Sequence, residues 1–219
     1  MKKILKNILL VLICFMIIGC KKQNVNDWII NKNDSSLDLK ADYIKPYNDA
    51  MKDKDYNYEL VGLLGEQVVS GTNYMYLVYD SDNNNYKVIT VYKNLENKSS
   101  ILYTNDFDVT KYVNESKEAN TQNISGGWIT NIFGKNKLNK KEIDLFNKST
   151  EKIVSVSYIP ISVLATEEKS GTNYAYLCYG KTQDKIGTTN IYLLTVYEDE
   201  HHTKEVVSIC YIDLSKFAK

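Results

Sequence analysis

Residues 67–74 read Gln-Val-Val-Ser-Gly-Thr-Asn-Tyr, a short polar turn between two runs in which apolar and polar residues alternate. The preceding run covers residues 58–66, and the following run begins at Met75. A strand, a turn that contains glycine and a second strand are typical of a β-hairpin. Glycine suits the tip because it has no Cβ and lets another backbone come close. The pattern therefore predicts a hairpin whose tip lies at residues 68–71.

The hairpin belongs to an internal repeat. Ser-Gly-Thr-Asn-Tyr recurs at residues 170–174, an offset of 100, and Trp-Ile occurs at both 28–29 and 128–129. The offset grows to 105 after an insertion near residues 181–189, where a loop accepts extra residues at little cost. We therefore predict two tandem domains, and their boundaries are 27–112 and 126–219, with a polar linker at 113–125 between them.

Each copy is expected to hold a short strand, one helix and four further strands. In the second copy, Asn139 with Glu142 three residues later predicts a helix N-terminus. In the first copy, Ser35 with Asp38 gives the same signal, and Pro46 is expected to kink or break the helix. The predicted strands cover 57–67, 71–80, 86–94 and 100–107, then 154–167, 172–180, 189–197 and 205–212. One helix on one face of an antiparallel meander predicts an α+β fold for each domain.

The N-terminal residues are typical of an export signal. Lysines precede an apolar run at residues 8–18 that is too short to span a membrane comfortably, and the run ends in Ile-Gly-Cys at 18–20. This ending resembles the lipobox of bacterial lipoproteins, which implies a lipid on Cys20, cleavage before it and a tether at 21–26. The chain is then expected in the cell envelope, at the outer membrane if the organism has two, because Lys21 rather than Asp follows the cysteine. The alternatives are an ordinary secretory signal and an apolar start that contains a cysteine by chance.

Composition excludes several classes of function. The formal net charge is zero and no long basic run occurs, so we expect no binding to nucleic acid. The two histidines are adjacent, His201 and His202, with no evident set of further ligands, so we predict no metal site. No phosphate-binding loop, catalytic carboxylate pair or Ser-His-Asp set is present. We therefore expect no cofactor and no enzymatic activity.

Two cysteines remain after Cys14 and the predicted lipidation site. Cys178 and Cys210 fall in predicted strands with another strand between them, which places them about 10 Å apart, beyond the reach of a disulfide. We predict two free thiols.

The sequence of the hairpin resembles that of a known family. Gln-x-Val-x-Gly at 67–71 followed by Thr-Asn-Tyr resembles the first inhibitory hairpin of cystatins, most closely that of the stefin branch. A preceding helix with Lys45-Pro46 and a later turn at 93–97 are also similar to stefins. The resemblance implies two tandem cystatin-like domains and reversible inhibition of papain-like cysteine proteases by the first of them.

The cystatin resemblance also implies which residues enter the protease cleft. The hairpin, a second turn and the N-terminal trunk act together as a wedge, so all three should lie on one edge. The implied protease-binding residues are Gln67, Val68, Val69, Ser70, Gly71, Leu95 and Trp28.

The first copy departs from the family in having no glycine in its trunk. The second copy has Glu-Glu-Lys at 167–169 in place of Gln-Val-Val, and charged groups lose hydration on entering a cleft, so we expect it to be a degenerate copy. The alternative function is a non-inhibitory lipoprotein that uses the same fold for protein binding or adhesion. The 18 tyrosines, many in predicted strands, would support that alternative if the outward-facing ones were contiguous.

Overall fold

The computed structural model describes residues 28–30, 39–115, 127–130 and 137–218. The lipobox at Cys20, the tether at 21–26, the Ser35–Asp38 cap and most of the linker at 113–125 lie outside these residues. The described elements of the first half are α2 (Ala41–Met51), β1 (Tyr58–Val68), β2 (Gly71–Asp80), β3 (Asn85–Asn94), β4 (Ser99–Phe107) and α3 (Val109–Glu115). Those of the second half are β5 (Ile129–Thr130), α4 (Lys140–Thr150), β6 (Val156–Glu168), β7 (Gly171–Thr182), β8 (Thr189–Asp199), β9 (Lys204–Ile212) and the 3₁₀-helix η1 (Leu214–Phe217).

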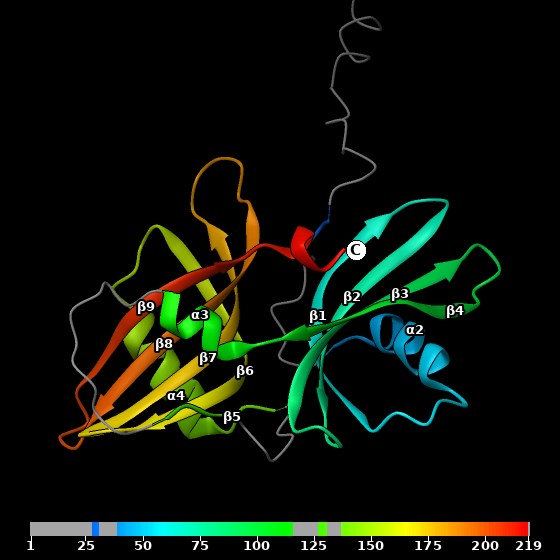
Figure 1. The fold of residues 1–219 in the computed structure, drawn as a ribbon. Helices are drawn as coiled ribbons and strands as arrows, with labels where there is room; N and C mark the ends of the chain where they lie inside the picture. Colours follow the sequence, from blue (N-terminus) through cyan, green and yellow to red (C-terminus); the bar gives the residue numbers. More distant parts are fainter. Residues whose placement is uncertain (1–27, 31–38, 116–126, 131–136, 219) are drawn as a thin grey trace, which may run out of the picture.

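The strands form two antiparallel sheets. Sheet A has the order β1-β2-β3-β4, and sheet B has the order β5-β6-β7-β8-β9 (Figure 1). The four main strands predicted for each half are present, and the insertion at 181–189 falls in the loop between β7 and β8. The short first strand is present in the second half as β5, whereas the first half has only an isolated bridge between Ile29 and Glu66. Polar turns join β1 to β4 and β6 to β9 into two meanders, and α4 lies between β5 and β6 in the chain.

One helix covers the outer face of each sheet. On sheet A, Tyr47 and Ala50 of α2 are buried against the strands, and the Tyr76 hydroxyl donates to the Tyr43 carbonyl oxygen at 2.7 Å. On sheet B, the Tyr176 hydroxyl donates to the Glu142 carbonyl oxygen of α4 at 2.9 Å. The same tyrosine position thus ties each helix to its sheet.

The helix signals in the sequence have different outcomes. At α4 the predicted N-cap is confirmed: the Asn139 side chain accepts from the Glu142 amide, and the Glu142 carboxylate accepts from the Asn139 amide. In α2, Pro46 lies inside one continuous helix, which it does not break.

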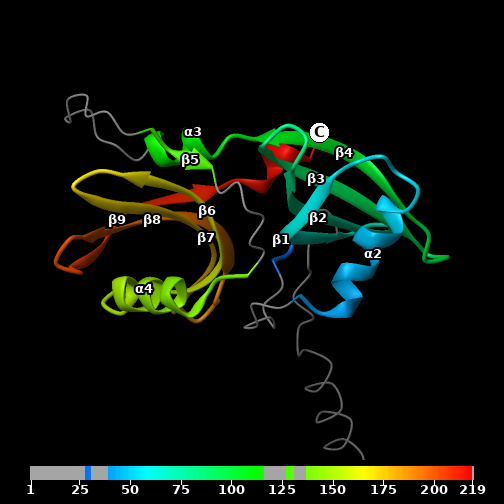
Figure 2. The same ribbon diagram turned by 90° about the horizontal axis from the view of Figure 1, so that it is seen from below.

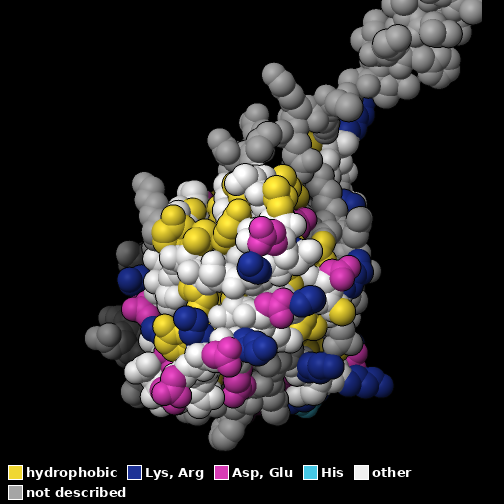
Figure 3. Space-filling model, turned by 90° about the vertical axis from the view of Figure 1, so that its right-hand side faces the viewer, with side chains coloured by type: hydrophobic (Ala, Val, Ile, Leu, Met, Phe, Trp, Pro, Cys, Tyr) yellow, Lys and Arg dark blue, Asp and Glu magenta, His cyan; other side chains and the backbone are white. Residues whose placement is uncertain are grey.

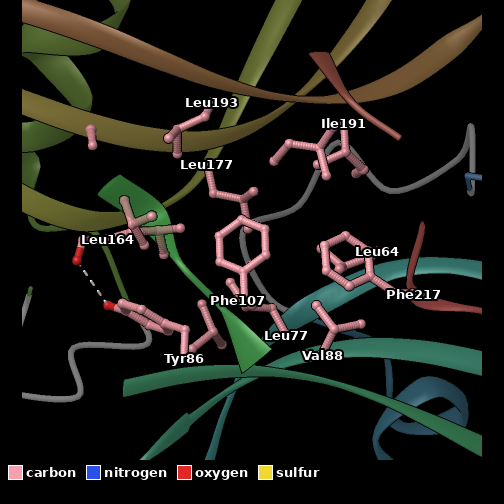
Figure 4. Close-up of a cluster of buried hydrophobic side chains, with 14 of the residues drawn as sticks. Leu64, Leu77, Tyr86, Val88, Phe107, Leu164, Leu177, Ile191, Leu193 and Phe217 are labelled. Carbon is pink, nitrogen blue, oxygen red and sulfur yellow. Dashed lines mark hydrogen bonds between the residues drawn. The ribbon is translucent and has the colours of Figure 1, made fainter. Parts of the chain in front are cut away.

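The inner faces of the two sheets pack on each other and share one hydrophobic core (Figure 4). Leu77 and Val88 of sheet A and Leu177 and Leu193 of sheet B are almost completely buried in it. The Tyr86 hydroxyl donates across the junction to the Leu164 carbonyl oxygen at 3.1 Å. In the opposite direction, the Tyr179 hydroxyl donates to the Leu63 carbonyl oxygen at 2.6 Å.

The predicted fold class is therefore wrong. The chain is not a pair of tandem cystatin-like domains, each with one helix on a meander; it is a mostly β protein of two antiparallel sheets with few helices. Both faces of each sheet are covered, one by a helix and one by the other sheet. This second covering removes the exposed face that an α+β domain with one helix would have.

The end of each half packs on the other half. After β4, the chain continues into α3, which contacts β8 and β9 of sheet B. After β9, it continues into η1, which contacts β4 of sheet A. Both segments begin with the same turn, in which Asp108 accepts from Thr110 and Asp213 accepts from Ser215, through backbone and hydroxyl groups alike. Figure 2 shows α4 on one side of sheet B and α3 on the other.

The cysteine prediction is confirmed. Cys178 is buried in β7 and Cys210 is partly buried in β9, with β8 between them, and both are free thiols. Burial raises the pKa of Cys178 well above its usual value, so its thiolate is scarce near neutral pH.

An ion-pair cluster on the outer face distinguishes sheet A from sheet B. Asp80 is buried and accepts from the Asn83 side chain at 2.8 Å, while Lys87 lies 3.7 Å from it and 2.8 Å from Asp106. In sheet B, tyrosines and a glycine occupy the corresponding positions, Gly180, Tyr192 and Tyr211.

The Asp80 cluster predicts a loss of stability in acid. Burial opposes ionisation of Asp80, but hydrogen bonds from Asn83 and Asp82 and the charge of Lys87 outweigh it and hold the pKa below its usual value. A lowered folded-state pKa contributes stability that is present above the unfolded value of about 4 and is lost as the pH falls through the folded value. Asp80→Asn is expected to flatten the fall in the free energy of unfolding below about pH 4.

Urea unfolding at a series of pH values measures this effect. Asp49→Asn is the matched control, because the Asp49 carboxylate is paired with Lys45 on the exposed side of α2. This substitution is expected to leave the pH dependence of the free energy of unfolding unchanged. Parallel pH curves for the wild type and Asp80→Asn would contradict the assignment.

Candidate functional site

The two hairpin tips of sheet A lie side by side at one end of the sheet. Gly71, at the start of β2, pairs with Asn94, at the end of β3, so the β1–β2 turn adjoins the β3–β4 turn. Figure 1 shows both turns on the same side of the molecule. The structure therefore brings together the hairpin at 67–71 and Leu95, as the sequence predicts.

Apolar side chains are exposed at this end. Val68 is 51% exposed and Leu95 is 83% exposed, while Val69 is partly buried beside the exposed Ser70. In Figure 3, hydrophobic side chains gather on the upper part of this face, and charged side chains of both signs cover the part below. The tips thus present an apolar edge to solvent.

Close packing fixes the shape of the first tip. A Cβ on Gly71 would lie 2.4 Å from the Lys93 carbonyl oxygen and 2.8 Å from the Tyr92 ring, so only glycine fits there. The Tyr92 hydroxyl also donates to the Ser70 carbonyl oxygen at 3.4 Å. Gly171, Tyr197 and Ser170 repeat this arrangement in sheet B.

Gln67 braces the hairpin from within. Its Oε1 accepts from the Asn73 side chain across the hairpin at 2.8 Å. In sheet B, the buried Glu167 accepts from Asn173 in the same way at 2.9 Å, and Lys169 lies 3.0 Å from that carboxylate. The Gln/Glu position therefore holds the turn in both halves, and the side chains available to a partner are those at 68–70 and 95.

Sequence reasoning missed two residues that shape the tip, Asn73 and Tyr92. Their signal was the recurrence of the same letters as Asn173 and Tyr197 in the second copy. The structure shows why the letters recur, because each pair locks its own hairpin.

Trp28 lies beside the hairpin but does not reach its tip. The trunk is fixed by Ile29, which exchanges two backbone hydrogen bonds with Glu66, of 2.6 and 2.8 Å. Trp28 is partly buried against the shared core and lines a cavity of about 440 Å³ with Leu214 of η1. Its role is to anchor the trunk next to the tips.

A cleft of about 610 Å³ lies behind the tips, between α2 and the end of sheet A. Tyr43 and Tyr74 form part of its wall, and burial raises the pKa of Glu66 there. Its charged lining residues balance in sign: Lys40, Lys45, Lys93, Asp42, Asp49 and Glu66. The cleft offers a partner polar contacts of both kinds beside the apolar edge.

The corresponding end of sheet B is charged. The turns at 94–98 and 199–203 have the same backbone hydrogen bonds, but Glu200 stands where sheet A has Leu95, and Glu168 where it has Val68. His202 lies 3.3 Å from the buried Glu198. The two ends thus share a backbone geometry and differ in surface chemistry.

The described residues are 28–30, 39–115, 127–130 and 137–218. Within these ranges, no group of three or more His, Cys, Asp or Glu side chains is placed to hold a metal ion. No helix in the same ranges is long and apolar enough to cross a membrane.

Comparison with known proteins gives no assignment. No model of a known protein family matches the chain, and no curated protein sequence matches it either.

Proposed function

We propose that this protein is a lipid-anchored surface protein that reversibly blocks the cleft of a papain-like cysteine protease with the two hairpin tips of sheet A. The observation that carries the proposal is the convergence of the exposed Val68 and Leu95 at one end of a sheet whose turns are locked from behind. Anchoring through Cys20 would hold this edge at the cell surface. The residues at 67–71 and the geometry of the two tips support this function without requiring a cystatin fold.

The tips suit insertion into a groove for two physical reasons. Tyr92 and Asn73 fix the first turn in the free protein, so little conformational entropy is lost on docking. Val68 and Leu95 are apolar and exposed, so burying them in a groove would contribute favourably to the free energy of binding. In a protease cleft, the smooth turn at 69–71 would occupy the substrate channel without a peptide bond extended toward the nucleophile.

A second function, binding to a protein that is not a protease, is favoured by one observation. Gln67, Ser70 and Gly71 have structural partners that recur in the charged second half, so these letters do not require a protease target. Among the implied tip residues, Val68, Val69 and Leu95 have no such structural role that recurs in the second half. The same tips would then enter an apolar groove of an adhesion or assembly partner.

The test is inhibition of papain by residues 21–219 and by a Val68→Glu, Leu95→Glu variant, which gives sheet A the tip letters of sheet B. Tight inhibition is expected for the unaltered chain. The variant should inhibit at least roughly a hundredfold more weakly, because two carboxylates would have to lose hydration in the cleft.

The matched control is Glu168→Val with Glu200→Leu, which changes the corresponding positions of sheet B. It should leave inhibition through sheet A intact. Absence of inhibition of papain and cathepsin-like enzymes at micromolar protein would reject the protease target and leave the second function.

A further inference from the structure

A pocket of about 230 Å³ lies on the inner face of sheet B, near the end where β8 turns into β9. Thr195, Tyr197 and Ser208 form its floor, and Trp128 and Val113 of α3 form its roof. Figure 2 shows α3 on the side of sheet B opposite α4, and Trp128 directly precedes β5, the edge strand of the sheet. The pocket is distinct from the hairpin tips of sheet A.

At the position that corresponds to Ser208, the first half has a larger side chain, Tyr103, which is 43% exposed. In the sheet B register, Ser208 pairs with Thr195, and in sheet A the corresponding Thr90 pairs with Tyr103. Each half also has a tryptophan, Trp28 or Trp128, that packs against the shared core. The two halves thus share a framework. The hydroxymethyl side chain of Ser208, in place of the phenol of Tyr103, leaves space in the second half.

The roof holds a hydrogen-bond donor that needs an acceptor. Among the described residues, the buried indole N–H of Trp128 has no hydrogen-bond partner. A buried donor without a partner costs free energy, and a bound acceptor would recover it. None of the described residues that line the pocket is charged.

From these observations we infer that the pocket binds a small neutral molecule, mostly apolar, that accepts a hydrogen bond from Trp128. The described lining combines Trp128, Tyr197 and two valines with the neutral Asn173, Thr195 and Ser208, so a charged ligand would lose its hydration without gaining a counterion. An apolar cavity of about 150 Å³ accepts benzene, so a pocket half as large again suits a bicyclic molecule of roughly nine or ten non-hydrogen atoms. A carbonyl or ether oxygen on such a molecule would reach the indole N–H.

The probes are 1-indanone and indane, which have the same fused rings and differ in the carbonyl oxygen. Isothermal titration calorimetry with the full chain is expected to show 1-indanone binding, about tenfold more tightly than indane. Trp128→Phe should remove this preference, because it removes the donor. No binding of 1-indanone at millimolar concentration would overturn the inference, as would equal affinities for the two probes.

A second test fills the pocket by substitution of a lining residue. Ser208→Tyr gives the second half the side chain of Tyr103 and is expected to abolish binding, while Tyr103→Phe, the control in the first half, should leave it unchanged. Ser208→Leu fills the pocket with a smaller side chain if the tyrosine variant does not fold, as judged by circular dichroism. Undiminished binding in a folded Ser208 variant would place the ligand elsewhere and overturn the inference.

Discussion

Replacing Phe107 with alanine is expected to lower the free energy of unfolding of the whole chain by about 3–5 kcal/mol. Phe107 lies in the core that the two sheets share, with its ring centroid 5.1 Å from that of Tyr112 and 5.8 Å from that of Phe217 (Figure 4). Its removal would leave a cavity lined by side chains of both halves. The loss should therefore appear in both halves together.

Tryptophan fluorescence can follow the halves separately, because Trp28 and Trp128 lie one in each. Urea unfolding of Trp28→Phe and Trp128→Phe variants, each with and without Phe107→Ala, should give coincident transitions that shift by the same amount. Leu95→Ala, a truncation at an exposed side chain, should shift neither. Two separate transitions, with only the first-half probe displaced, would contradict a single shared core.

The second large effect is expected from Gly71→Ala. The added methyl would meet the Lys93 carbonyl oxygen and the Tyr92 ring, so the two tips would have to move apart. We expect a loss of about 1–3 kcal/mol in stability together with a loss of papain inhibition. Urea unfolding and inhibition assays on the same sample measure the two effects.

Two glycine controls separate stability from function. Gly171→Ala meets the same obstacles in sheet B, at 2.4 Å from the Glu198 carbonyl oxygen, and should destabilise equally while leaving inhibition intact. Gly127→Ala meets nothing within 4 Å and should change neither property. Loss of inhibition in Gly171→Ala as well would show that stability, rather than the shape of the first tip, sets the activity.

The local elements of the fold were predictable from the sequence. The turn residues predict both hairpins, and the repeat predicts that the two halves have the same order of elements. Asn139 with Glu142 predicts the start of α4. These features depend on residues close together in the chain. Such contacts leave a pattern in the sequence.

The shared core was not predictable, because the central strands of each sheet are buried on both faces. In β2, Met75, Leu77 and Tyr79 face sheet B, while Tyr76 and Val78 face α2, and all five are buried. Tyrosine serves on either side of a strand, since its ring packs and its hydroxyl finds a distant carbonyl oxygen. A run of tyrosines and aliphatic residues therefore looks the same whether one face is covered or two.

The candidate site was predictable in part. The spacing of turns and strands places Val68 and Leu95 at the same end of the sheet. It does not show that Gln67 bonds to Asn73, because a bond across the hairpin depends on which residues come opposite one another. The same limit applies to Trp28, whose packing depends on η1, almost two hundred residues later in the chain.

The crossing of α3 and η1 bears on what a single copy of the repeat could do alone. Each copy carries at its C-terminal end the segment that closes the partner copy, so neither copy supplies its own closure. This is the geometry of an arm-exchanged dimer whose two subunits lie on one polypeptide. A fragment limited to the first half would keep α3 without the strands β8 and β9 that it contacts, and the inner face of sheet A would be open.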